Sequence, residues 1–142
     1  MLLGDGPLRG ELNALVASSR LSGNVDMPGF VENPYVYMKP AALLASSSRW
    51  EGFVNVLIES LAVGTPVIST TYSSGPIEIL DNGRYGRLTP VGDPDALADA
   101  MLATLDDPPN AERLFARARM FSPDNIIPQY LEILLGHSLE TS

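Results

Sequence analysis

The sequence predicts an α/β fold in which a parallel β-sheet is flanked by helices. Short apolar runs that resemble buried strands alternate with longer segments of helical pattern, and Gly or Pro residues separate them. This alternation is typical of parallel sheets, because parallel strands need a crossover connection. The 142 residues, 45% of them hydrophobic, are enough for one compact core but too few for two full domains.

The first third of the chain is expected to hold a helix, a short strand and a helical turn. Pro7 favours a helix start and the helix should end near Ser19, since Gly23-Asn24 provides an exit. A short strand is expected over 25–27. A short helix or turn follows over 34–38.

The middle third contains the clearest strand–helix–strand pattern. A buried strand over 41–45 precedes three serines, and a nearly continuous apolar run predicts a helix over 54–63. Gly64 is a typical helix stop. A short buried strand over 66–69 should then follow.

The last third is expected to be mainly helical. Its predicted elements are a helical turn over 77–80, a strand over 85–89, a helix from 94 to about 105, and helices over 111–120 and 123–135. Asp93-Pro94 is a good helix start, since Asp caps free N–H groups and Pro suits the first turn. A polar tail occupies about 136–142.

Composition disfavours several functional classes. The chain has no cysteine, so thiolate metal sites and disulfides do not arise, and its one histidine, His137, lies in the polar tail. No apolar run approaches the length of a membrane span. A net charge of −8 disfavours nucleic acid as a partner. Arg113, Arg117 and Arg119 are expected to form a solvated helix face, with contact to a membrane surface as the alternative.

Two carboxylates, Glu51 and Glu59, are the most informative residues of the chain. Glu59 falls among apolar neighbours inside the predicted helix, where an ionised carboxylate is costly unless it is hydrogen-bonded, for example by a polyol. Glu51 lies near the start of that helix, where free N–H groups favour anions such as phosphate. The segment therefore suits a nucleotide-sugar. The alternative is an ordinary first-turn acid at Glu51 and a solvent-facing Glu59.

The segment over 47–68 resembles the E-x7-E signature of retaining glycosyltransferases of the GT-B fold, in the GT4 or glycosyl transferases group 1 family. Further short motifs follow in the family's order: Gly4-Asp-Gly-Pro-Leu8, Met27-Pro-Gly-Phe-Val31, Ser74-Gly-Pro-Ile-Glu-Ile-Leu80, Gly83-Arg-Tyr-Gly86 and Pro90-Val-Gly-Asp-Pro94. The resemblance implies a Rossmann-like C-terminal domain of such an enzyme, N-terminally truncated, as a single partial domain over residues 1–142.

The resemblance also implies roles for individual residues. Glu59 would bond the ribose hydroxyls of the donor. Glu51, taken as the catalytic residue, would contact the hydroxyls of the donor sugar. The implied donor-binding set is Val31, Glu51, Gly52, Phe53, Val54, Asn55, Val56 and Glu59. For Val31, an ordinary strand-end position is the alternative, and for Phe53 a core anchor.

The chain departs from the family pattern in three ways. Val54 stands where a small residue or proline is common, so its side chain is expected to narrow the donor-sugar pocket. The basic pair that neutralises the diphosphate and the acceptor-binding domain are both expected upstream of Met1. An incomplete sheet with an exposed apolar edge is the predicted consequence.

The implied activity is retaining glycosyl transfer from a nucleotide-sugar, preferably a UDP-sugar, in polysaccharide, lipopolysaccharide or oligosaccharide biosynthesis. No metal or cofactor is expected, and the acceptor would be a saccharide or a lipid-linked one. The implied location is the cytoplasm, including the inner face of the membrane. The alternatives are a non-catalytic nucleotide-sugar-binding subunit, a non-functional fragment and, more remotely, a sugar-nucleotide epimerase.

Overall fold

The computed structural model describes residues 1–52 and 54–135. It divides into two compact units, one over Met1–Val36 and one from Tyr37 onward. The single partial domain expected over residues 1–142 stays a prediction. The predicted polar tail over 136–142 lies outside the described residues.

The first unit is built around helix α1 (Arg9–Ser18) and one parallel bridge between Leu3 and Gly29. The guanidinium of Arg9 donates to the backbone oxygen of Met27 at 2.5 Å. The predicted strand over 25–27 is wrong, because the backbone contacts of this segment, such as the bond from Leu2 N–H to Asp26 O, do not form a ladder. Gly29, with φ of +89°, turns the chain at the point where a ladder would have to continue.

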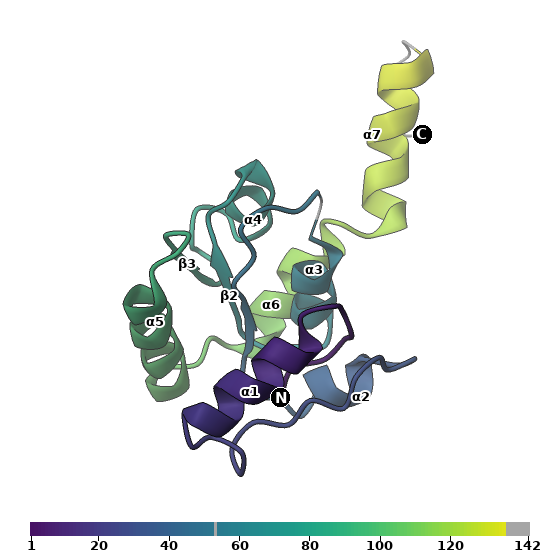
Figure 1. Cartoon of the computed structure of the whole chain (residues 1–142). Helices are drawn as coiled ribbons and strands as arrows, with labels where there is room; N and C mark the ends of the chain where they lie inside the picture. Colours follow the sequence, from purple (N-terminus) through teal and green to yellow (C-terminus); the bar gives the residue numbers. More distant parts are fainter. Residues whose placement is uncertain (53, 136–142) are drawn as a thin grey trace. The chain divides into compact units, whose positions relative to one another are not determined.

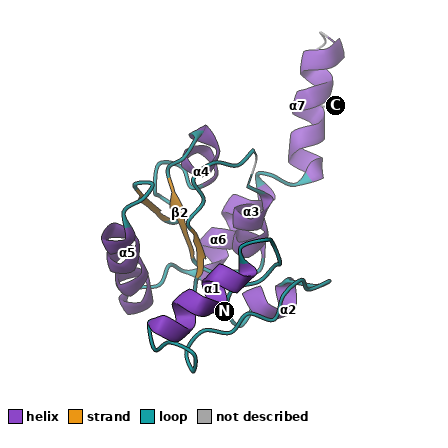
Figure 2. Cartoon of the chain, viewed as in Figure 1, coloured by secondary structure: helices purple, strands orange, loops and turns teal. Residues whose placement is uncertain are grey.

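The second unit contains a three-stranded parallel sheet in the order β1-β2-β3. Figure 2 colours the strands orange and labels the central one, β2. The strands are β1 (Leu44–Ser46), β2 (Val67–Thr70) and β3 (Arg87–Thr89). The parallel sheet predicted from the sequence is confirmed. All four residues of β2 are buried, because strands pair on both of its edges and helices cover both faces of the sheet. The predicted burial of β1 is wrong, since this edge strand leaves Ala45 exposed.

Six helices complete the described chain after α1. They are α2 (Tyr35–Met38), α3 (Asn55–Ala62), α4 (Ser74–Ile79), α5 (Pro94–Asp106), α6 (Ala111–Arg119) and α7 (Pro123–Leu135). The sequence predicted each to within three residues at either end. Ser73, Asp93 and Asn110 cap their helices through side-chain oxygens. Gly64, with φ of +82°, follows α3 as the predicted stop.

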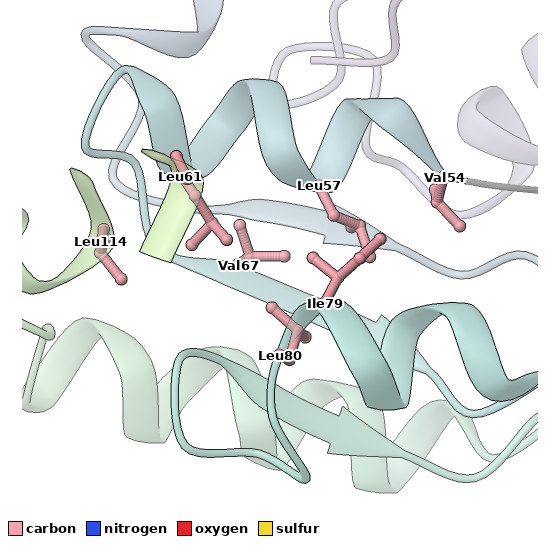
Figure 3. Close-up of a cluster of buried hydrophobic side chains, with 8 residues drawn as sticks. Val54, Leu57, Leu61, Val67, Ile79, Leu80 and Leu114 are labelled. Carbon is pink, nitrogen blue, oxygen red and sulfur yellow. The ribbon is translucent and has the colours of Figure 1, made fainter. Parts of the chain in front are cut away.

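Helices cover both faces of the sheet in the second unit. In Figure 1, α3 and α6 lie on one side of the strands and α5 lies on the other. The core fills the space between α3, α4, α6 and the sheet. Its buried side chains are Val54, Leu57, Leu61, Val67, Ile79, Leu80, Leu114 and Ala118, and Figure 3 labels all of them but Ala118.

The core side chain of Ile79 provides the first test of this packing. Ile79→Ala should lower the free energy of unfolding by about 2–5 kcal/mol, because Ile79 is fully buried and its truncation leaves a cavity. The measurement is urea denaturation followed by circular dichroism. Ile133→Ala is the matched control, since Ile133 of α7 is 80% exposed. Equal losses in the two variants would contradict the described core.

A second prediction concerns Gly86 at the start of β3. A Cβ added to Gly86 would lie 2.5 Å from the backbone oxygen of Val67, which cannot move without distorting β2. Gly86→Ala should therefore destabilise the chain by about 1–3 kcal/mol. Gly10→Ala should leave stability unchanged or raise it by up to about 1 kcal/mol, because open space surrounds this position of α1 and alanine is the better helix former. A thermal melt that leaves both variants at the wild-type midpoint would refute the close approach.

Candidate functional site

Two loops meet at the carboxyl ends of β1 and β2. The first, between β1 and α3, carries Ser48, Glu51 and Gly52, and the second, between β2 and α4, carries Tyr72. The hydroxyl of Thr70, the last residue of β2, donates to the backbone oxygen of Ser48 at 2.5 Å. This bond ties the first loop to the end of the central strand. Ligands of open α/β sheets bind at this edge.

Glu51 is held by its own loop. The hydroxyl of Ser48 donates to Oε1 of Glu51, and the carboxylate is otherwise exposed to solvent. Ser48 is therefore linked to β2 through its backbone oxygen and to Glu51 through its side chain. One carboxylate oxygen of Glu51 is oriented by this contact, while the other has no hydrogen-bond partner among the described residues.

The N-terminus of α3 lies between the two glutamates and is open. Val54 provides no side-chain cap, and the first turn contains no acidic residue. The backbone N–H groups of Asn55 and Val56 are consequently available, and free amides at a helix N-terminus favour an anion. This is the part of the chain where the family resemblance places the donor diphosphate.

The expectation that the Val54 side chain narrows the donor-sugar pocket is wrong. Val54 is 1% exposed and points into the core together with Leu57 and Ile79 (Figure 3). The position before α3 is therefore filled by a core anchor. The backbone amide of Val54 remains a predicted donor contact.

Glu59 lines a pocket of about 590 Å³. The pocket is formed by Asn55, Ile58 and Glu59 of α3, Glu78 of α4, Phe121, and Ile126, Gln129, Tyr130 and Ile133 of α7. The Glu59 side chain is half-buried, and it accepts no hydrogen bond from any described residue. The sequence predicted that an acid at this position would require a hydrogen-bond partner, and the described chain does not provide one.

Tyr72 is a site residue that the sequence reasoning missed. Its ring packs against the core, and its hydroxyl oxygen is buried without a hydrogen-bond partner in the described chain. Burial raises the pKa of the Tyr72 phenol above 10.0, and the negative charge of Glu51 raises this pKa further. Tyr72 could have been found from its position two residues after β2, because ligands of such sheets bind at the carboxyl ends of the strands.

Three other predicted donor contacts, Val31, Phe53 and Gly52, stay predictions. Val31 is half-buried in the first unit, two residues after the turn at Gly29, so its pairing with a base remains a prediction. Phe53 lies outside the described residues. Gly52 is exposed, and its backbone oxygen lies near Gly75, where an added Cβ would be 3.8 Å away.

The arginines near the C-terminus have local structural partners. The guanidiniums of Arg113 and Arg117 each lie 5.2 Å from the centre of the Tyr85 ring. Arg113 donates to the backbone oxygen of Arg84, and Arg117 donates to that of Ile79. Arg113 also lines a second pocket, of about 380 Å³, where β2 and β3 begin. These arginines attach α6 to the end of α4 and to the loop before β3. The Glu51 and Glu59 carboxylates are not part of that pocket.

Metal binding and membrane spanning have no support among the described residues. No group of three or more His, Cys, Asp or Glu side chains within residues 1–52 and 54–135 could hold a metal ion. In the same residues, no helix has both the length and the apolar character needed to span a bilayer.

The α/β fold places Glu51 and Glu59 around the start of α3, and comparison with known proteins identifies the family to which such a domain belongs. The sequence matches the family described as Glycosyl transferases group 1 over residues 1–107. The chain belongs to this family, as its E-x7-E signature predicted.

Characterised relatives cover nearly the whole chain. An N-acetylgalactosamine-N,N'-diacetylbacillosaminyl-diphospho-undecaprenol 4-alpha-N-acetylgalactosaminyltransferase of Campylobacter jejuni is 34% identical over 96% of this chain and 38% of its own length. A lipopolysaccharide core biosynthesis glycosyltransferase, LpsE of Rhizobium meliloti, is 33% identical over 94% of this chain and 40% of its own length. The chain thus spans well under half of the relatives it matches.

Solved structures support the fold. Anabaena Alr3699/HepE in complex with UDP and glucose superposes with a TM-score of 0.84 at 26% identity, covering 96% of this chain and 40% of that one. The lipopolysaccharide outer core galactosyltransferase WaaB superposes with the same TM-score at 20% identity, covering 94% of this chain and 39% of that one. The chain has the α/β architecture of GT-B glycosyltransferases, as predicted.

The bond between Thr70 and Ser48 can be tested by substitution. Thr70→Val removes the hydroxyl and should cost about 0.5–1.5 kcal/mol of unfolding free energy, because it frees the Glu51 loop from β2. Thr70→Ser keeps the hydroxyl and should recover most of that loss. Urea denaturation measures both. If serine restores nothing, the loss comes from packing at this position and the anchoring bond is unsupported.

Proposed function

We propose that this chain is the donor-binding part of a retaining glycosyltransferase and that it binds a nucleotide-sugar, preferably a UDP-sugar. One observation carries the proposal: Glu51 and Glu59 flank the open N-terminus of α3 in a member of the Glycosyl transferases group 1 family. Carboxylates accept hydrogen bonds from hydroxyl groups, and free helix amides favour phosphate. A nucleotide-sugar presents hydroxyls on both sides of a diphosphate.

Each part of the donor has a proposed partner. Glu59 accepts from the ribose hydroxyls, since its carboxylate has no partner within the described chain and faces a pocket. Glu51 accepts from hydroxyls of the donor sugar, where its free carboxylate oxygen is exposed. Backbone amides at 52–56 approach the diphosphate. Val31 pairs its backbone with the base.

The proposed chemistry uses electrostatic stabilisation of the leaving group. As the glycosidic bond to the diphosphate breaks, negative charge accumulates on the phosphate oxygens. The fixed dipole of α3 and its first-turn N–H groups stabilise that charge without having to reorganise. Retention of anomeric configuration is part of the proposal through the E-x7-E signature.

UDP is the preferred nucleotide because of a structural neighbour. Alr3699/HepE, 26% identical over nearly the whole chain, is described as a complex with UDP and glucose. The acceptor is proposed to be a saccharide or a lipid-linked saccharide, bound by the part of the relatives that this chain does not span. The proposed location is the cytoplasm, including the inner face of the membrane.

Calorimetric titration of UDP tests the proposal. Wild-type chain should bind UDP, and Glu59→Gln should weaken binding about 10- to 100-fold, because the neutral amide replaces a charged acceptor of the ribose hydroxyls. Glu112→Gln removes the same charge from the exposed first turn of α6 and should bind UDP like the wild type.

Either of two results would contradict the proposed site. A Glu59→Gln variant with wild-type affinity would remove Glu59 from the nucleotide site. Absence of UDP binding by a folded wild-type chain would favour the alternative of a fragment without independent binding. A chain that binds UDP-sugars, but transfers nothing with the remaining domain supplied separately, would support a non-catalytic subunit.

A further inference from the structure

The ring of Tyr72 is held by packing, but its hydroxyl group has no hydrogen-bond partner among the described residues. Its ring packs on the buried cluster that contains Val54 and Ile79, so the ring position is fixed by the core. Its hydroxyl oxygen is buried and has no hydrogen-bond partner in the described chain. A buried hydroxyl without a partner costs free energy, and native proteins keep such groups mainly where a ligand or an ordered water completes them.

Tyr72 lies in the turn that the Glu51 loop contacts. Thr70, two residues before Tyr72, donates to the backbone oxygen of Ser48, and the hydroxyl of Ser48 donates to Glu51. On the other side of Tyr72, Gly75 approaches the backbone oxygen of Gly52. The turn is therefore bonded to the Glu51 loop before Tyr72 and lies beside that loop after it. The charge of Glu51 also acts on the phenol, raising its pKa, so the phenol stays protonated at neutral pH.

The hydrogen-bonding capacities of Glu51 and Tyr72 limit which chemical group could contact both side chains. An ionised carboxylate only accepts hydrogen bonds, whereas a neutral phenol can donate one. A phosphate oxygen could accept from Tyr72 but has no proton to give Glu51, and it would be repelled by that carboxylate. A sugar hydroxyl can accept from one group and donate to the other.

We propose that Tyr72 is a donor-sugar contact, whose O–H donates to a hydroxyl oxygen of the transferred sugar while that hydroxyl donates to Glu51. This inference rests on the proposed donor-binding function and adds a contact that determines preference for the sugar. The hydroxyl group of Tyr72 then has no role in holding the nucleotide.

The experiment compares UDP with UDP-sugars in wild type and Tyr72→Phe, which removes only the hydroxyl. The probes are UDP, UDP-glucose, UDP-galactose and their N-acetylamino forms, titrated by calorimetry. In the variant, UDP should bind within about 2-fold of wild type, while the tightest UDP-sugar should bind about 3- to 10-fold more weakly. Tyr35→Phe, on a tyrosine that is 43% exposed, should change neither affinity.

A double variant tests whether the two side chains share one hydroxyl. In a Glu51→Gln background, Tyr72→Phe should weaken binding of the UDP-sugar by less than about 2-fold, because part of the shared contact is already lost. The thermal midpoint of Tyr72→Phe without ligand should equal or exceed that of wild type, since the deleted hydroxyl has no partner there. A merely structural role would lower this midpoint and would not separate UDP from UDP-sugars.

The contrary outcomes are distinct. Equal weakening of UDP and UDP-sugar by Tyr72→Phe would place the phenol on the nucleotide and overturn the inference, as would unchanged affinities. If UDP-sugars bind the wild-type chain no more tightly than UDP does, the inference is also overturned, while the proposed nucleotide binding stands. A wild-type chain that binds neither would overturn the proposed function, and this inference with it.

Discussion

The division of α3 into a buried side and an open side is the constraint on which the site depends. Leu57 and Leu61 are fully buried against the sheet and α6, and they fix the helix in position and rotation. Because Leu57 and Leu61 occupy the core side of α3, the half-buried Glu59 lies on another side of the helix, where it lines a pocket. Because Val54 anchors the residue before the helix, the first-turn amides are held at the carboxyl edge of the sheet.

The central strand β2 links this helix to the loop that carries Glu51. β2 is fully buried and is paired with a strand on each side, so its backbone is held in place. Its last side chain, Thr70, bonds the Glu51 loop, and the turn that follows presents Tyr72. The same strand therefore places a carboxylate and a phenol. Such preorganised polar groups can recognise a polyol without a large ordering cost.

Much of the fold was predictable because its signals are local. The apolar run of α3, the stop at Gly64 and the Asp93 cap each specify an element from adjacent residues. The prediction of a strand over 25–27 was wrong. A single bridge and a turn at Gly29 stand where a ladder was expected, and strand pairing depends on tertiary contacts that local sequence does not show. The predicted burial of β1 was wrong for a related reason. An apolar run indicates a strand but does not show whether that strand lies at the edge or in the centre of the sheet.

The candidate site was predictable only in its charged residues. Glu59 stood out because an acid among apolar neighbours needs a partner, and the family signature marked Glu51. Val54 was misjudged, because the sequence alone does not show that the side chain before α3 points into the core. Tyr72 was missed, because an unpaired hydroxyl becomes visible only when every neighbouring donor and acceptor is known.

The most direct test of the central claim is amide chemical-shift mapping of the ¹⁵N-labelled chain during titration with UDP. The account predicts that the largest shifts fall on the amides of Gly52 and of Asn55 to Glu59 around the start of α3. It also predicts little change where β2 and β3 begin, near Val67 and Arg87. Saturable shifts centred on Arg87 and Arg113, with α3 unperturbed, would contradict it.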